Sequence, residues 1–98
     1  MPPKRKRNKI FLEFSFTHVE RDNILKYCLL EDDIARRFRK IVPVGSDIVV
    51  VFDKAEANEM MISLSHAINE VSGNTDLKKK FEDLHDRFRE KYNSIFSI

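Results

Sequence analysis

The sequence predicts a small single domain of the α/β class, with an α+β arrangement as the alternative. The chain of 98 residues contains two short, strongly apolar runs, and each is followed by a capping box and an amphipathic stretch. Its 42% hydrophobic and 35% charged residues, with only two glycines, are typical of a compact, helix-rich protein. We expect the order strand, helical section, strand and helical hairpin, with a two-stranded sheet packed on the helices.

The first strand is predicted over residues 9–16, KIFLEFSF, because large apolar residues alternate there with a period of two. One face of this strand carries Ile10, Leu12, Phe14 and Phe16, and the other carries Phe11, Glu13 and Ser15. Such a pattern is typical of a strand that is buried on one side only.

A helical section should begin at Thr17, because Thr17 and Glu20 have the spacing of a capping box. The acidic run Glu31-Asp32-Asp33 then interrupts the apolar stripe, which resumes at Ile34. Either one long helix bends near Leu30, or a second short helix begins with Asp32 or Asp33 as its cap. A single helix would make the two strands parallel, whereas two antiparallel helices would make them antiparallel. Of the two, we favour the single or bent helix.

The second strand is predicted over residues 47–52, DIVVVF, and Asp53 with Glu56 forms a second capping box directly after it. The helix that follows should end at Gly73. Asn74 or Thr75 caps a last helix, which forms a hairpin with its predecessor. The apolar stripe of this last helix consists of Leu77, Phe81, Leu84, Phe88, Tyr92 and Ile95.

The composition of the chain indicates in which cellular environment the protein is found. No apolar run approaches the ~18 residues of a membrane span, so no membrane association is predicted. The single cysteine, Cys28, excludes an internal disulfide and is typical of a reducing compartment, which favours a cytoplasmic location. We expect residues 1–8 to form a basic leader and residues 9–98 to form the domain. Beyond residue 9 the chain has 13 basic and 16 acidic residues, so any general attraction to nucleic acid must come from the leader.

Two basic groups are candidates for contact with phosphates. The first is Lys4, Arg5, Lys6, Arg7 and Lys9, and the second is Arg36, Arg37, Arg39 and Lys40. Clusters of this kind can neutralise phosphates. A flexible, solvated terminus is the favoured explanation of the first group. Favourable charges near a helix C-terminus are a sufficient explanation of the second. A nucleic-acid-associated protein is therefore the alternative function rather than the first.

No residue pattern predicts catalysis, a metal site or a cofactor. His18, His66 and His85 fall in three different helices without the spacing of metal ligands. Cys28 lies on an apolar face, and Asp53 is fully explained as a helix cap. We therefore predict a protein that is not an enzyme.

Association is the function that the sequence favours most. The second strand is apolar on both faces, and helices that cover one face would leave Phe11, Val49 and Val51 exposed. Ile95 and Phe96 add to the expected exposed apolar surface. A homodimer, formed edge to edge or face to face, would cover it, and another protein partner could do the same. The prediction is a non-enzymatic interaction or regulatory module that self-associates.

Overall fold

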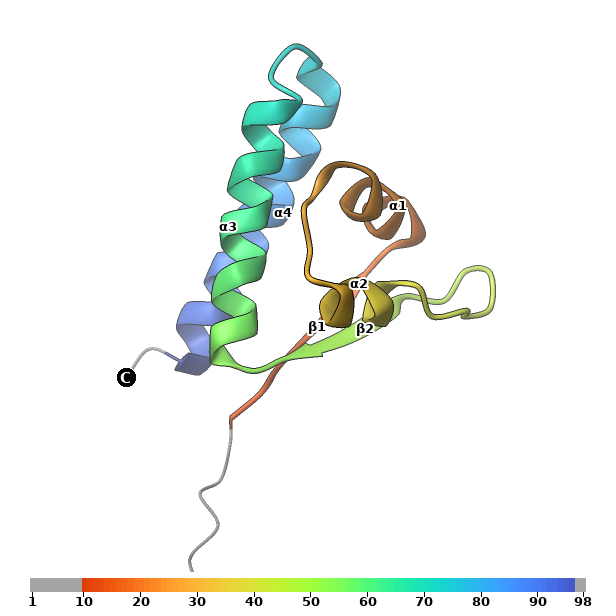
Figure 1. Ribbon diagram of the computed structural model, residues 1–98, viewed down its shortest axis with the longest axis vertical. Coiled ribbons are helices and arrows are strands. Elements are labelled where there is room, and N and C mark those ends of the chain that lie inside the picture. Colours follow the sequence, from red (N-terminus) through yellow and green to blue (C-terminus); the bar gives the residue numbers. More distant parts are fainter. Residues whose placement is uncertain (1–9, 97–98) are drawn as a thin grey trace, which may run out of the picture.

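The computed structural model describes residues 10–96, and in this range each of two strands is followed by two helices. In chain order they are β1 (Leu12–Phe16), α1 (His18–Tyr27), α2 (Asp32–Phe38), β2 (Ile48–Phe52), α3 (Lys54–Glu70) and α4 (Thr75–Phe96). The predicted small α/β domain and its C-terminal helical hairpin are confirmed. The long helices α3 and α4 run side by side, and the helices gather on one side of the sheet (Figure 1). Within residues 10–96, no helix has the length and apolar content needed to cross a membrane.

The helical section is split, so the favoured single helix is wrong and the alternative is right. Helix α1 ends where Cys28 adopts an extended conformation, and Glu31, which precedes α2, is extended as well. The Ser63 hydroxyl on α3 donates to the Leu29 carbonyl at 2.9 Å and fastens the connection between the two helices. Because two helices return the chain to its starting end, β1 and β2 pair antiparallel, with Leu12 opposite Phe52 and Phe16 opposite Ile48.

Both predicted capping boxes are present. The Glu20 amide donates to the Thr17 hydroxyl at 3.1 Å, and the Glu56 amide donates to the Asp53 carboxylate at 2.8 Å. In each box the glutamate accepts from the amide of its capping residue in return. Of the two candidate caps for α4, it is Asn74 whose side chain accepts, from the Leu77 amide. Helix α3 ends at Glu70, three residues before the predicted stop at Gly73.

Aromatic rings form the centre of the core. Phe16 of β1 packs against Phe38 of α2 with ring centroids 4.9 Å apart, and Phe52 of β2 packs against Phe88 of α4 at 5.3 Å. All four rings are fully buried. Helix α3 completes the core with Ala57, Met60, Leu64 and Ala67. The core therefore lies between the sheet and the helices, and no element of residues 10–96 covers the opposite face of the sheet.

Candidate functional site

The uncovered face of the sheet is the most prominent apolar surface that the sequence pointed to. Phe11, Val49 and Val51 are 51%, 44% and 40% exposed, whereas Ile48, Val50 and Phe52 on the other face of β2 are buried. Glu13 and Ser15 are exposed between them, opposite Val51 and Val49 respectively. We call Phe11, Glu13, Ser15, Val49 and Val51 the open face.

The end of α4 does not belong to this surface. Phe96 is only 9% exposed and is part of the core, and its ring lies 5.0 Å from that of Tyr92. Ile95 is half-buried against the same core. The expectation that these two residues add exposed apolar surface is wrong, because the amphipathic stripe of α4 continues inward to its last turn.

The outer edge of β2 is closed by an arginine. The Arg37 guanidinium donates to the Val51 carbonyl at 2.9 Å and to both carboxylate oxygens of Glu56 at 2.8 Å. It also reaches Asp33, one turn earlier on α2, at 3.1 Å. Hydrogen bonding to Glu56 raises the pKa of Arg37 above its already high ordinary value. This residue therefore ties α2, β2 and α3 together at the point where β2 ends.

The outer edge of β1 faces a groove instead. The groove has a volume of about 450 Å³ and is lined by Glu13, Phe14, Ser15, Val49, Arg87 and Lys91. In an antiparallel pair, opposite residues both turn their peptide groups either inward or outward. The Val51 carbonyl is turned outward to Arg37, so its partner Glu13, and Ser15 two residues on, turn their peptide groups toward the groove.

Charge in this groove is only partly neutralised within residues 10–96. Arg87 pairs with Glu20 of α1 and with Asp83 on its own helix. Lys91 and Glu13, both exposed, have no ion-pair partner among the described residues. The groove thus offers outward peptide groups, one acidic side chain and one unpaired basic side chain.

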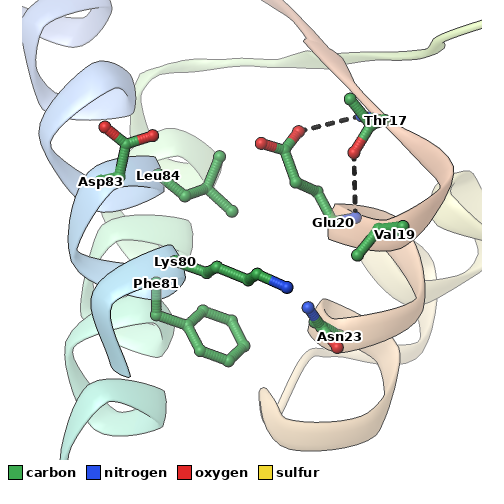
Figure 2. A pocket seen from close by; sticks show the side chains of 8 residues that line it. All are labelled: Thr17, Val19, Glu20, Asn23, Lys80, Phe81, Asp83 and Leu84. Carbon is green, nitrogen blue, oxygen red and sulfur yellow. Dashed lines mark hydrogen bonds between the residues drawn. The ribbon is translucent and has the colours of Figure 1, made fainter. Parts of the chain in front are cut away.

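A smaller cleft of about 200 Å³ lies between α1 and α4 (Figure 2). Its lining residues are Thr17, Val19, Glu20, Asn23, Lys80, Phe81, Asp83 and Leu84. Lys80 extends from α4 toward Asn23 on α1 in this view. Both carboxylate oxygens of Glu20 are already engaged, one by the Thr17 amide and one by Arg87. Asp83, the other carboxylate of the cleft, pairs with Arg87 on its own helix, so both carboxylates are engaged in contacts within the fold.

The predicted phosphate-contact residues differ in where they lie in the structure. Lys4, Arg5, Lys6, Arg7 and Lys9 lie outside the described residues. Arg39 and Lys40 are exposed just beyond α2, and Arg36 is exposed 3.8 Å from Asp33. Arg37 bonds to Glu56 and to the Val51 carbonyl, so its guanidinium is used in contacts that stabilise the fold. Contact with nucleic acid stays a prediction, and of the second basic group only Arg36, Arg39 and Lys40 are presented to solvent.

The cysteine and histidine side chains that could act in catalysis or metal binding do not come together in one site among the described residues. Burial raises the pKa of the Cys28 thiol to about 12, so this residue is a protonated core side chain at neutral pH. His85 lies 3.5 Å from the Ser65 hydroxyl on the adjacent helix, while His66 is exposed. Among residues 10–96, no three histidine, cysteine, aspartate or glutamate side chains come together in a way that could hold a metal ion.

No protein-family model matches this chain, and no significant match was found among curated proteins or solved structures. The function of the protein therefore has to be inferred from its geometry. Sequence reasoning identified the open face but missed the groove, because nothing in the spacing of Arg87 and Lys91 indicates that α4 passes beside β1. The long-range pair between Glu20 and Arg87 had no sequence signal for the same reason.

Proposed function

We propose that this protein is a non-enzymatic interaction module that self-associates through its sheet. The observation that carries the proposal is an incomplete sheet. It has two strands, its open face exposes Phe11, Val49 and Val51, and the outer edge of β1 faces a groove. Two-stranded sheets are marginal in water, and a free strand edge is a template for pairing with another chain. A second copy of the same chain supplies a matching sheet.

Burial elsewhere in the domain supports this choice of surface. The helix-facing side of the sheet is well packed, so exposure on the other side is not the result of loose packing. Phe14 is partly buried there, and the other apolar residues on that side are almost fully inaccessible: Leu12, Phe16, Ile48, Val50 and Phe52. The exposed parts of Phe11, Val49 and Val51 amount to on the order of 200 Å² of apolar surface. At about 25 cal/mol per Å², covering this surface would contribute about 5 kcal/mol for each copy before the cost of association. For two copies this gain is of the same size as the cost of association, about 4–15 kcal/mol, so main-chain pairing along a strand edge has to supply the remaining affinity.

Solution mass tests the proposal. Sedimentation of the full chain across the micromolar range should show a species of twice the 11.6 kDa chain mass, with the dimer fraction rising as concentration rises. A single monomeric species throughout that range would overturn the proposed function.

A further inference from the structure

Resting on this proposed self-association, we propose that two copies join β1 to β1 in antiparallel register. Glu13 of each copy then lies opposite Ser15 of the other. The result is a continuous four-stranded sheet with the order β2-β1-β1-β2.

Face-to-face packing is disfavoured by Glu13. This carboxylate stands on the open face directly opposite Val51, so two stacked open faces would bury two like charges near the symmetry axis. The apolar area is also small, on the order of 200 Å² per copy against ~800 Å² per partner in a standard interface. Pairing along an edge leaves Glu13 at the surface, and main-chain hydrogen bonds supply the affinity.

Among the described residues, only β1 presents both of its outward-turned residues without a side chain bonded to their peptide groups. On β2, the Val51 carbonyl accepts from Arg37, which Glu56 holds in place. On β1, the peptide groups of Glu13 and Ser15 are turned toward the groove, and no described side chain bonds to them. A paired strand lies about 4.8 Å from its neighbour, and the groove is lined by three consecutive residues of β1, Glu13, Phe14 and Ser15.

The register follows from elimination. Pairing Glu13 with Glu13 of the second copy would set like charges directly opposite each other. Pairing Ser15 with Ser15 would place Glu13 opposite Thr17, whose amide already donates to Glu20 at 2.9 Å. Pairing Glu13 with Ser15 sets no like charges opposite each other. It places Thr17 opposite Phe11, outside the span Leu12–Phe16 of β1, so both outward residues within the strand keep a free partner. The two residues exchange two backbone hydrogen bonds, and the two-fold axis repeats the exchange.

This register also satisfies the unpaired charges of the groove. Ser15 and Lys91 line the same groove, so Glu13 of the incoming copy arrives beside Lys91. Symmetry provides the contact twice. The outer edges of the resulting four-stranded sheet are the two β2 strands, and Arg37 blocks both of them at Val51. The assembly is therefore a closed dimer rather than a growing fibre.

The first test removes one amide. Ser15→Pro deletes an N–H that points into the groove and takes no part in the β1–β2 ladder. The variant chain should therefore still fold, and it should sediment as a monomer. Ser15→Ala, which keeps the amide, should remain dimeric, as should Val51→Lys, which lies on the open face but does not line the groove. A folded Ser15→Pro dimer together with monomeric Val51→Lys would overturn edge pairing and leave self-association standing. A wild-type chain that is monomeric at all concentrations would overturn both.

The second test needs no proline. Chains carrying Glu13→Lys and chains carrying Lys91→Glu each place like charges across the proposed interface, so each alone should dimerise roughly tenfold more weakly than wild type. Mixing the two restores opposite charges at both contacts while each chain keeps its own internal contacts. Native mass spectrometry of the mixture should show predominantly the heterodimer. A statistical mixture of homodimers and heterodimers would overturn the proposed register even if Ser15→Pro fails to fold.

Discussion

Replacing Arg37 by alanine should destabilise the domain far more than replacing its neighbour Arg36. Arg37 makes paired hydrogen bonds of 2.8 Å to Glu56 and one of 2.9 Å to the Val51 carbonyl, and its side chain is 28% exposed. Arg36 is 74% exposed, and its nearest carboxylate oxygen, on Asp33, lies 3.8 Å away. The two substitutions remove the same side chain from adjacent positions of one helix, so their difference isolates these contacts.

The structure sets the size of the effect. Hydrogen bonds between charged groups contribute about 1.5–3 kcal/mol each in protected settings, and partial exposure of Arg37 and Glu56 lowers that contribution. We expect Arg37→Ala to lower the free energy of unfolding by about 2 kcal/mol, which is roughly 10 °C in melting temperature for a domain of this size. Arg36→Ala should cost no more than about 0.5 kcal/mol. Arg37→Lys should fall between them, because lysine keeps the charge and loses the paired geometry.

Urea unfolding at one fixed protein concentration measures these differences, since self-association adds a concentration-dependent term to stability. Raising the salt concentration should reduce the cost of Arg37→Ala only partly, because the pair with Glu56 is shielded from solvent on both sides. If Arg37→Ala and Arg36→Ala are equally mild, Arg37 does not brace the end of β2. Arg37 would then not explain why the outer edge of β2 is closed at Val51.

Three further outcomes are expected. Thr17→Ala and Asp53→Ala should each cost about 1 kcal/mol in urea unfolding, and a change near zero would contradict their roles as caps. Cys28 should react with a thiol reagent only as fast as the domain opens. Because its pKa is raised, stability should fall between pH 9 and about 12, and Cys28→Ala should lack that part of the fall. Deletion of residues 1–8 should leave the melting temperature unchanged, because the core is built from residues 12–96. If the chain binds duplex DNA, the same deletion should flatten the salt dependence of binding, and an unaltered slope would direct attention to Arg39 and Lys40.

Local patterns predicted most of the fold. Alternation along β1 separated Leu12 and Phe16, which are buried, from Phe11, which is exposed, because a strand directs successive side chains to opposite faces. The capping boxes at Thr17 and Asp53 are contacts between near neighbours, so their spacing was sufficient to predict them.

Features that depend on distant residues were not predictable in this way. The break after Tyr27 depends on the exit of the chain at Cys28 and on a bond from Ser63, far along the sequence, to Leu29. The prediction that Phe96 is exposed was wrong, because the packing of the last turn of α4 depends on the elements that lie next to it in space. The same holds for the candidate site. The open face could be predicted from one strand, but the groove needs β1 and α4 together.

Amide hydrogen exchange at Glu13 and Ser15 tests the account most directly, because both peptide groups point away from β2 in the monomer and into the interface of the proposed dimer. Exchange should be rapid in dilute protein, and protection of both amides should increase with concentration in step with the dimer fraction. The Val50 amide, which lies within the existing ladder, should be protected at every concentration. Rapid exchange at Glu13 and Ser15 in a solution that sedimentation shows to be dimeric would contradict pairing through β1.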